Sequence, residues 1–83
     1  MIQTIEWKGK KIEIEDNYID VDFVVGITNA KSEKEIMNLM STVLKMAVQT
    51  PDFKVGKMRI KDFNEFYAKM LKEVVGGGDG QGQ

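Results

Sequence analysis

Two short runs near the N-terminus alternate apolar and polar side chains. Ile5 and Trp7 occupy alternate positions in the first run, Ile12 and Ile14 do so in the second, and charged residues stand between them. Successive side chains of a β-strand point to opposite faces, and Gly9 lies in the polar stretch that joins the runs. The pattern predicts a β-hairpin with one apolar face, which helices need to cover because an isolated hairpin is only marginally stable.

The next apolar segment, residues 18–27, is ambiguous in type. Its many β-branched residues favour a strand. Asp20 in the position of a helix cap, together with the i, i+4 pairs Ile19 with Phe23 and Phe23 with Ile27, favours a short helix. The sequence predicts the helix here, with the strand as the alternative.

The longest helical pattern covers residues 32–50. Ser32 followed by Glu35 has the spacing of a capping box and predicts the start of the helix, while Pro51 predicts its end. At 100° per residue the apolar stripe is about 200° wide, whereas a helix with one side in water usually needs little more than about 100°. The stripe consists of Ile36, Met37, Leu39, Met40, Val43, Leu44, Met46, Ala47 and Val48.

The excess width of this stripe has two interpretations. The helix is either central to its own domain and covered on both sides, or it keeps one apolar edge for a partner. Methionine is compatible with both, since its flexible side chain fills core gaps and also serves surfaces that adapt to different partners. The edges of the stripe, Leu39 with Met46 and Met37 with Val48, are therefore the positions where we expect a partner or a second copy.

A connection and a final helix follow Pro51. Asp62 and Glu65 repeat the spacing of a cap and an acidic residue, which predicts that the last helix begins after a connection over residues 52–62. One face of that helix, about 140° wide, is apolar as in an ordinary core-facing helix. It is formed by Phe63, Phe66, Tyr67, Met70, Leu71 and Val74.

The C-terminal end changes composition abruptly. Residues 76–83 contain five of the eight glycines and no apolar side chain, which predicts a flexible tail. The sequence thus predicts one α+β domain over residues 1–75, in which an N-terminal β-hairpin packs on about three helices, followed by a disordered glycine-rich tail over residues 76–83.

The amino-acid composition limits the kinds of catalytic and metal-binding site that the chain can form. The chain has no cysteine and no histidine, which excludes thiolate metal sites and the usual nucleophile–histidine arrangements. Asp20 and Asp22 would diverge on a helix, and the spacing of a calcium-binding loop is missing. We therefore expect no catalytic residue, no metal site and no cofactor. No run approaches the roughly 18 apolar residues that span a bilayer, so we expect a cytoplasmic protein that does not enter a membrane.

The net charge of −1 is unevenly distributed. Residues 1–30 carry three lysines against six acidic groups, and residues 31–83 carry nine basic against seven acidic groups, which hints at head-to-tail contact between copies. A cluster of four cations beside Phe53 also has the pattern of segments that grip phosphates and stack bases. As an alternative function, a nucleic-acid-binding or regulatory protein would use Lys54, Lys57, Arg59 and Lys61.

The order of elements and three local matches resemble the tail assembly chaperones of long-tailed bacteriophages. The matching segments are TIEWKGK at residues 4–10, DVDF at 20–23 and IKDFNEF at 60–66. Members of that family are noncatalytic and keep the long tape-measure protein soluble while tail-tube subunits assemble around it. The resemblance implies the same partners here. A programmed frameshift often extends these proteins, and the glycine run at 76–78 is compatible with such a junction or with a cloning remnant.

The leading hypothesis is a noncatalytic α+β chaperone, active as a homo-oligomer, that holds an apolar helical partner such as the tape-measure protein. The contact is expected on the methionine-rich helix and the loop after it. The residues predicted to make it are Met37, Leu39, Met40, Met46, Phe53 and Met58.

Overall fold

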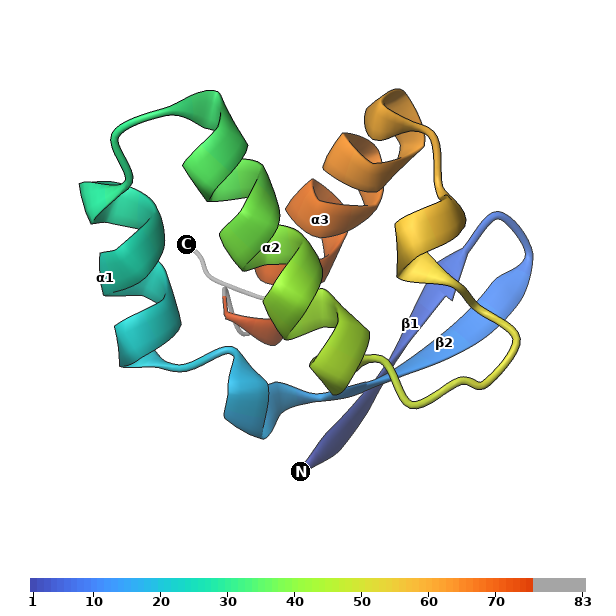
Figure 1. The fold of residues 1–83 in the computed structure, drawn as a ribbon. Helices are drawn as coiled ribbons and strands as arrows, with labels where there is room; N and C mark the ends of the chain where they lie inside the picture. The colour runs from blue at the N-terminus through green and yellow to red at the C-terminus, as the bar shows by residue number, and fades with distance from the viewer. Residues whose placement is uncertain (76–83) are drawn as a thin grey trace.

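An antiparallel hairpin followed by three α-helices makes up residues 1–75, the part of the chain that the computed structural model describes (Figure 1). The predicted α+β class is confirmed, whereas the predicted flexible tail at 76–83 lies outside the described residues. The elements are β1 (Ile2–Trp7), β2 (Lys10–Glu15), the 3-10 helix η1 (Asp16–Tyr18), α1 (Val21–Asn29), α2 (Glu33–Ala47), the 3-10 helix η2 (Val55–Lys57) and α3 (Ile60–Val74).

The hairpin forms as its alternation predicts. Ile5 pairs directly with Ile12 across the two strands, and both side chains are buried in the core. Lys8 and Gly9 make the connecting turn with φ values of 47° and 81°. Two successive positive φ angles are those of a tight hairpin turn whose twist matches the strands. The apolar face of the hairpin is thereby turned toward the helices.

Residues 18–27 adopt the predicted helix, displaced by a few residues. The side chain of Asp20 accepts a hydrogen bond of 2.9 Å from the backbone N–H of Phe23, so α1 begins at Val21. The N-cap satisfies an N–H group that has no partner within the helix. Phe23 is the residue of α1 that is buried.

The helix predicted over residues 32–50 is shorter than expected. It starts at the Ser32 cap but ends at Ala47, so Pro51 is not what stops it. Val48 instead forms a β-bridge with Ile14, and the N–H of Gln49 donates to the carbonyl of Glu13 over 2.8 Å. The open edge of β2 thus pairs with the chain just after α2 through one isolated bridge and provides a partner for the Gln49 N–H.

The predicted start of the last helix is also wrong. α3 begins at Ile60 with Arg59 at the cap position and no capping side chain. Asp62 lies in the first turn of α3, and its carboxylate accepts a hydrogen bond from Lys8 instead of the backbone. A carboxylate in the first helical turn is still favourable, because it complements the helix dipole.

α2 occupies the centre of the molecule, between α1 on one side and η2 on the other (Figure 1). Met40, Leu44 and Ala47 of α2 are buried in one core cluster with Phe66 and Met70 of α3 and with Ile5, Ile12 and Ile14 of the hairpin. The centre of the wide apolar stripe on α2 is therefore explained by packing within the domain, which is the first of the two interpretations given for its width.

Candidate functional site

Two adjoining surface hollows follow the side of α2 that faces η2. Their volumes are about 480 and 230 Å³, and they share Lys45, Val55 and Gly56. We call the two hollows together the α2–η2 groove. They are concave and partly apolar, as is usual for binding sites.

The larger hollow combines apolar walls with cations. Val48, Pro51 and Phe53 line it together with Lys45, Lys54 and Lys57. Since no acidic residue is among its lining side chains in the described chain, this end of the groove carries positive charge.

The smaller hollow mixes apolar side chains with the polar Asn38, Ser41 and Lys45. Met37 contributes from α2, Met58 from the loop after η2, and Ile60 and Phe63 from the first turn of α3. Ile60 is 68% exposed although it is a large apolar residue. An apolar side chain at the rim of such a hollow loses contact with water when a partner docks, which stabilises the complex.

Gly56 sets the close approach of η2 to α2. A Cβ atom at this position would lie 3.2 Å from Cε of Lys45, closer than most such contacts in proteins. The absence of a side chain therefore lets the stem of Lys45 cross η2 where the two hollows meet. The stem covers apolar surface while the ammonium stays available to a partner.

The wall on the η2 side is held by packing and by backbone hydrogen bonds. Val55 is buried, and the N–H of Met58 donates to its carbonyl over 3.2 Å. The ring of Phe53 lies 5.0 Å from that of Phe66, centroid to centroid, within the range of stabilising aromatic pairs. A wall fixed in this way loses little conformational freedom on binding.

Three of the six predicted contact residues come together in this groove. Met37 and Met58 line the smaller hollow and Phe53 lines the larger one. Met40 is only 6% exposed and belongs to the core, which is a correction to its expected place on the contact surface. At the centre of the stripe, Met40 belongs to the buried core cluster that also contains Phe66 and Met70 of α3.

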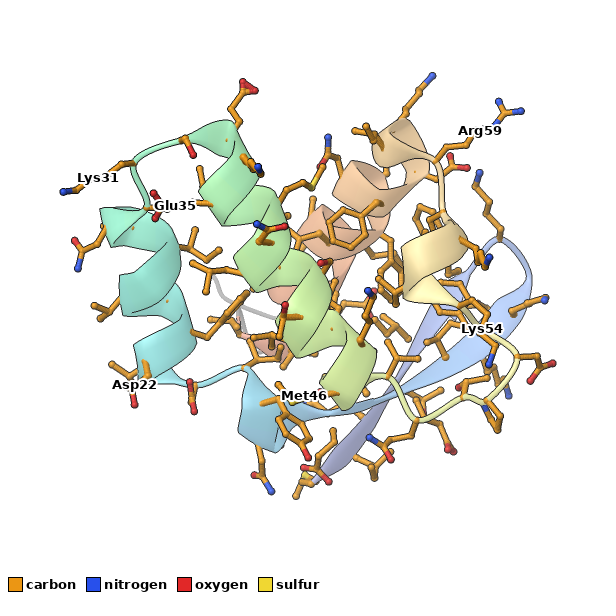
Figure 2. The ribbon with its side chains drawn as sticks, viewed as in Figure 1. Asp22, Lys31, Glu35, Met46, Lys54 and Arg59 are labelled. Carbon is orange, nitrogen blue, oxygen red and sulfur yellow. The ribbon has the colours of Figure 1, made fainter. Side chains whose placement is uncertain are left out.

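The other two predicted contact residues lie away from the groove. Leu39 points toward α1, where its Cδ1 would be 3.6 Å from a Cβ on Gly26. Met46 is 48% exposed and stands at the C-terminal end of α2 (Figure 2). Neither side chain lines the hollows.

Two of the four cations of the alternative function line the groove. Lys54 and Lys57 line the larger hollow, while Arg59 and Lys61 are exposed and line neither hollow. Figure 2 shows Arg59 extending into solvent well away from Lys54. The structure thus divides this predicted set.

A second apolar surface was not anticipated from the sequence. Val21, Val24 and Val25 are 75%, 45% and 48% exposed and lie on the outer side of α1, opposite the buried Phe23. We call these three residues the α1 valine face. The signal was present in the sequence, because a helix with Phe23 and Ile27 turned inward turns Val21 and Val25 outward and leaves Val24 at the side.

A small ionic network ties the chain start to the end of the hairpin, apart from the groove. The Met1 amino group lies 2.7 Å from Glu15 Oε2 and 3.1 Å from Asp16 Oδ1. Hydrogen bonds to these carboxylates raise the pKa of the amino group, and the pKa values of both carboxyl groups are lowered, chiefly by the amino group for Glu15 and by Gln3 for Asp16. Burial raises the pKa of the Tyr67 hydroxyl.

Two kinds of site were not found in the described chain. Within residues 1–75, no three acidic, histidine or cysteine side chains converge as a metal ion would require. Among the helices of that same part, none is both long and apolar enough to cross a membrane.

Comparison with known proteins assigns no family. No family model matches the chain, no curated protein matches its sequence, and no solved structure matches its fold.

Proposed function

We propose that this protein is a noncatalytic binding protein that holds an apolar helical segment of a partner in the α2–η2 groove. The observation that carries the proposal is the groove itself, where Met37, Met58 and Ile60 lie around one hollow and Phe53 lies in the next. Unbranched methionine side chains in such a place adapt to different apolar contacts.

The shape and charge of the groove favour an amphipathic helix with acidic flanks. The groove runs beside α2, the apolar side chains of Met37, Met58 and Ile60 line its smaller hollow, and Lys45, Lys54 and Lys57 lie along its larger hollow. A helix laid in a groove buries its apolar stripe, and flanking charges of opposite sign guide its orientation. Each fully buried apolar side chain of medium size contributes about 1.5–3 kcal/mol in transfer terms, so a few contacts give useful affinity.

The resemblance to phage tail assembly chaperones gives this partner a candidate identity. A tape-measure protein is a long helical chain with apolar surface, which is the chemistry that the groove suits. Under this proposal the protein keeps that chain soluble in the cytoplasm of the host cell and hands it to tail-tube subunits.

Methyl NMR of methionine tests the proposal, because the chain has six methionines spread over its surface and core. The probe is a synthetic helical peptide of about four turns with a leucine stripe and glutamate flanks. We expect the methyl signals of Met37 and Met58 to shift on titration and those of Met1 and Met46 to stay unchanged.

The matched control is a peptide with the same residues in scrambled order, which should shift none of these signals. Shifts confined to Met46, or no shift at all, would contradict the proposal.

Titration with a single-stranded oligonucleotide tests the alternative function, because three lysines line the larger hollow. Binding that weakens steeply with added salt would favour that alternative.

A further inference from the structure

We propose that copies of this chain associate head to tail, with the α1 valine face of one copy seated in the α2–η2 groove of the next. The inference rests on the proposed binding role of the groove and names a second copy as one of its occupants. It is carried by three observations: an uncovered apolar helix face, complementary charge, and the positions of the two surfaces on opposite sides of α2.

The α1 valine face is the kind of ligand that the groove suits. α1 has Phe23 buried on its inner side and three exposed valines on its outer side, and a helix that is apolar on both sides is normally covered on both. Figure 1 shows α1 at the edge of the molecule, with α2 as its neighbour on the inner side. Val21 and Val25 are one helical turn apart and form a continuous ridge.

The two surfaces carry opposite charge. Asp20 and Asp22 flank Val21 at the exposed N-terminal end of α1, and α1 itself contains no lysine or arginine (Figure 2 labels Asp22). The larger hollow presents three lysines. Opposite potentials on facing surfaces speed encounter and select orientation.

The geometry makes the association heterologous. α1 packs on one side of α2, at Gly26 and Leu39, whereas the groove follows the other side, at Lys45 and Gly56. When the valine face of one copy fills the groove of a second, the first copy keeps its groove and the second keeps its valine face. Such contacts extend into a chain of copies or close into a ring.

Competition for the groove follows from the same arrangement. A neighbouring α1 and a partner helix would use the same two hollows and the same lysines. A partner helix that binds more tightly therefore releases one copy from the next, so partner binding and self-association oppose each other. Self-association would keep both apolar surfaces covered until a partner arrives.

Two variants separate the two halves of the proposed contact. The double variant Val21→Lys with Val25→Lys removes the valine face and leaves the groove intact. The double variant Lys57→Glu with Ile60→Glu alters the groove and leaves the valine face intact. All four positions are exposed, and glutamate at the first position of α3 complements the helix dipole, so both variants should fold. Circular dichroism checks that they do.

Sedimentation equilibrium on the full chain gives the test. The unchanged protein should gain average mass with concentration and lose it with added salt, and Ile2→Lys, at an exposed apolar position on the hairpin, should behave in the same way. Each double variant alone should be monomeric, with self-association weakened about tenfold or more. An equimolar mixture of the two should form heterodimers and nothing larger, because each mixed pair has one intact contact.

The inference is overturned if the unchanged protein stays monomeric at all concentrations, if the valine variant still self-associates, or if the mixture forms no heterodimer. The peptide titration keeps this failure distinct from that of the proposed function. A valine variant that binds the helical peptide while failing to form mixed dimers leaves the groove function standing without self-association.

Discussion

The Nζ atom of Lys8 donates a hydrogen bond to Oδ1 of Asp62 over 3.1 Å, joining the hairpin turn to the first turn of α3. The same ammonium lies 5.4 Å from the ring centroid of Trp7, and that ring packs edge-on against Phe66 at 5.5 Å. The Lys8–Asp62 contact on the surface thus lies next to the Trp7–Phe66 pair, and both contacts join the hairpin to α3.

The Lys8–Asp62 contact should contribute little to stability by itself. Both side chains are partly exposed, and exposed ion pairs typically contribute less than about 1 kcal/mol. We expect Asp62→Asn and Lys8→Met each to lower the free energy of urea unfolding by less than about 1 kcal/mol. A double-mutant cycle measures the coupling between them, and a coupling near zero would show that the pair only orders the surface.

The aromatic pair beneath it should matter far more. Phe66 is fully buried and contacts the rings of both Trp7 and Phe53. Phe66→Ala removes about 3–5 kcal/mol, a large share of the total stability of a small domain. Trp7 fluorescence should report a protein that is mostly unfolded or unfolds at low urea, whereas the exposed control Ala68→Gly should stay folded. A Phe66→Ala variant with unchanged stability would contradict the described core.

Two glycine substitutions should differ because of their backbone angles. Gly9 has φ of 81°, where an added Cβ costs about 1–2 kcal/mol. Gly9→Ala should therefore lower the urea midpoint clearly. Gly56→Ala meets only the flexible end of Lys45, so its midpoint should change little while the affinity for the helical peptide falls. Equal losses of stability in the two variants would argue against the described turn.

Two methionines of α2 should respond oppositely to a charge. Met40 is buried and Met46 is exposed. Met40→Lys places an unpaired ammonium in the core and should abolish cooperative thermal unfolding. Met46→Lys should leave both the thermal midpoint and peptide binding nearly unchanged, since Met46 lies outside the groove. Loss of peptide binding in a folded Met46→Lys variant would move the contact to the other end of α2.

The ionic network at Met1 predicts a stability window in pH. The amino group has its pKa raised above 8.0 by Glu15 and Asp16, so its stabilising effect is full below pH 8.0 and is lost as pH rises through the raised value. Folding lowers the pKa of Glu15 from 4.5 and that of Asp16 from 3.8. The two ionised carboxylates therefore stabilise the fold fully above these ordinary pKa values, and this stabilisation is lost as the pH falls through the lowered pKa values.

The difference in urea midpoint between the unchanged protein and the double variant Glu15→Gln with Asp16→Asn should therefore be largest between the usual carboxyl and amino pKa values. It should shrink toward both acid and alkaline pH. A difference that does not vary with pH would show that the network acts through packing rather than charge.

Local signals in the sequence predicted most of the elements. The alternation around Ile5 and Ile12 specified the hairpin, and the caps Asp20 and Ser32 marked the starts of α1 and α2. These features depend on residues within a few positions of one another, so they are readable without knowledge of the fold.

The errors all involve partners distant in sequence. α2 ends at Ala47, after which Val48 and Gln49 pair with the edge of β2, and Asp62, the expected cap, lies in the first turn of α3 and pairs with Lys8. Met37, Phe53 and Met58 of the groove were named from the sequence, but its shape was not, since its walls come from α2, η2 and α3 and meet only after folding. The valine face, by contrast, follows from helical geometry alone.

The pairing of residues 48–50 with β2 also constrains how the chain folds during synthesis. The Gln49 N–H bonds to the Glu13 carbonyl just beyond the end of α2, whereas the aromatic contact of Trp7 needs Phe66, which follows later in the chain. A nascent chain that has emerged only as far as η2 therefore holds a hairpin and a helix without the residues of α3 that seal their shared interior. Folding on the ribosome should be delayed until α3 has left the exit tunnel, and until then the apolar half-core is open to chaperones.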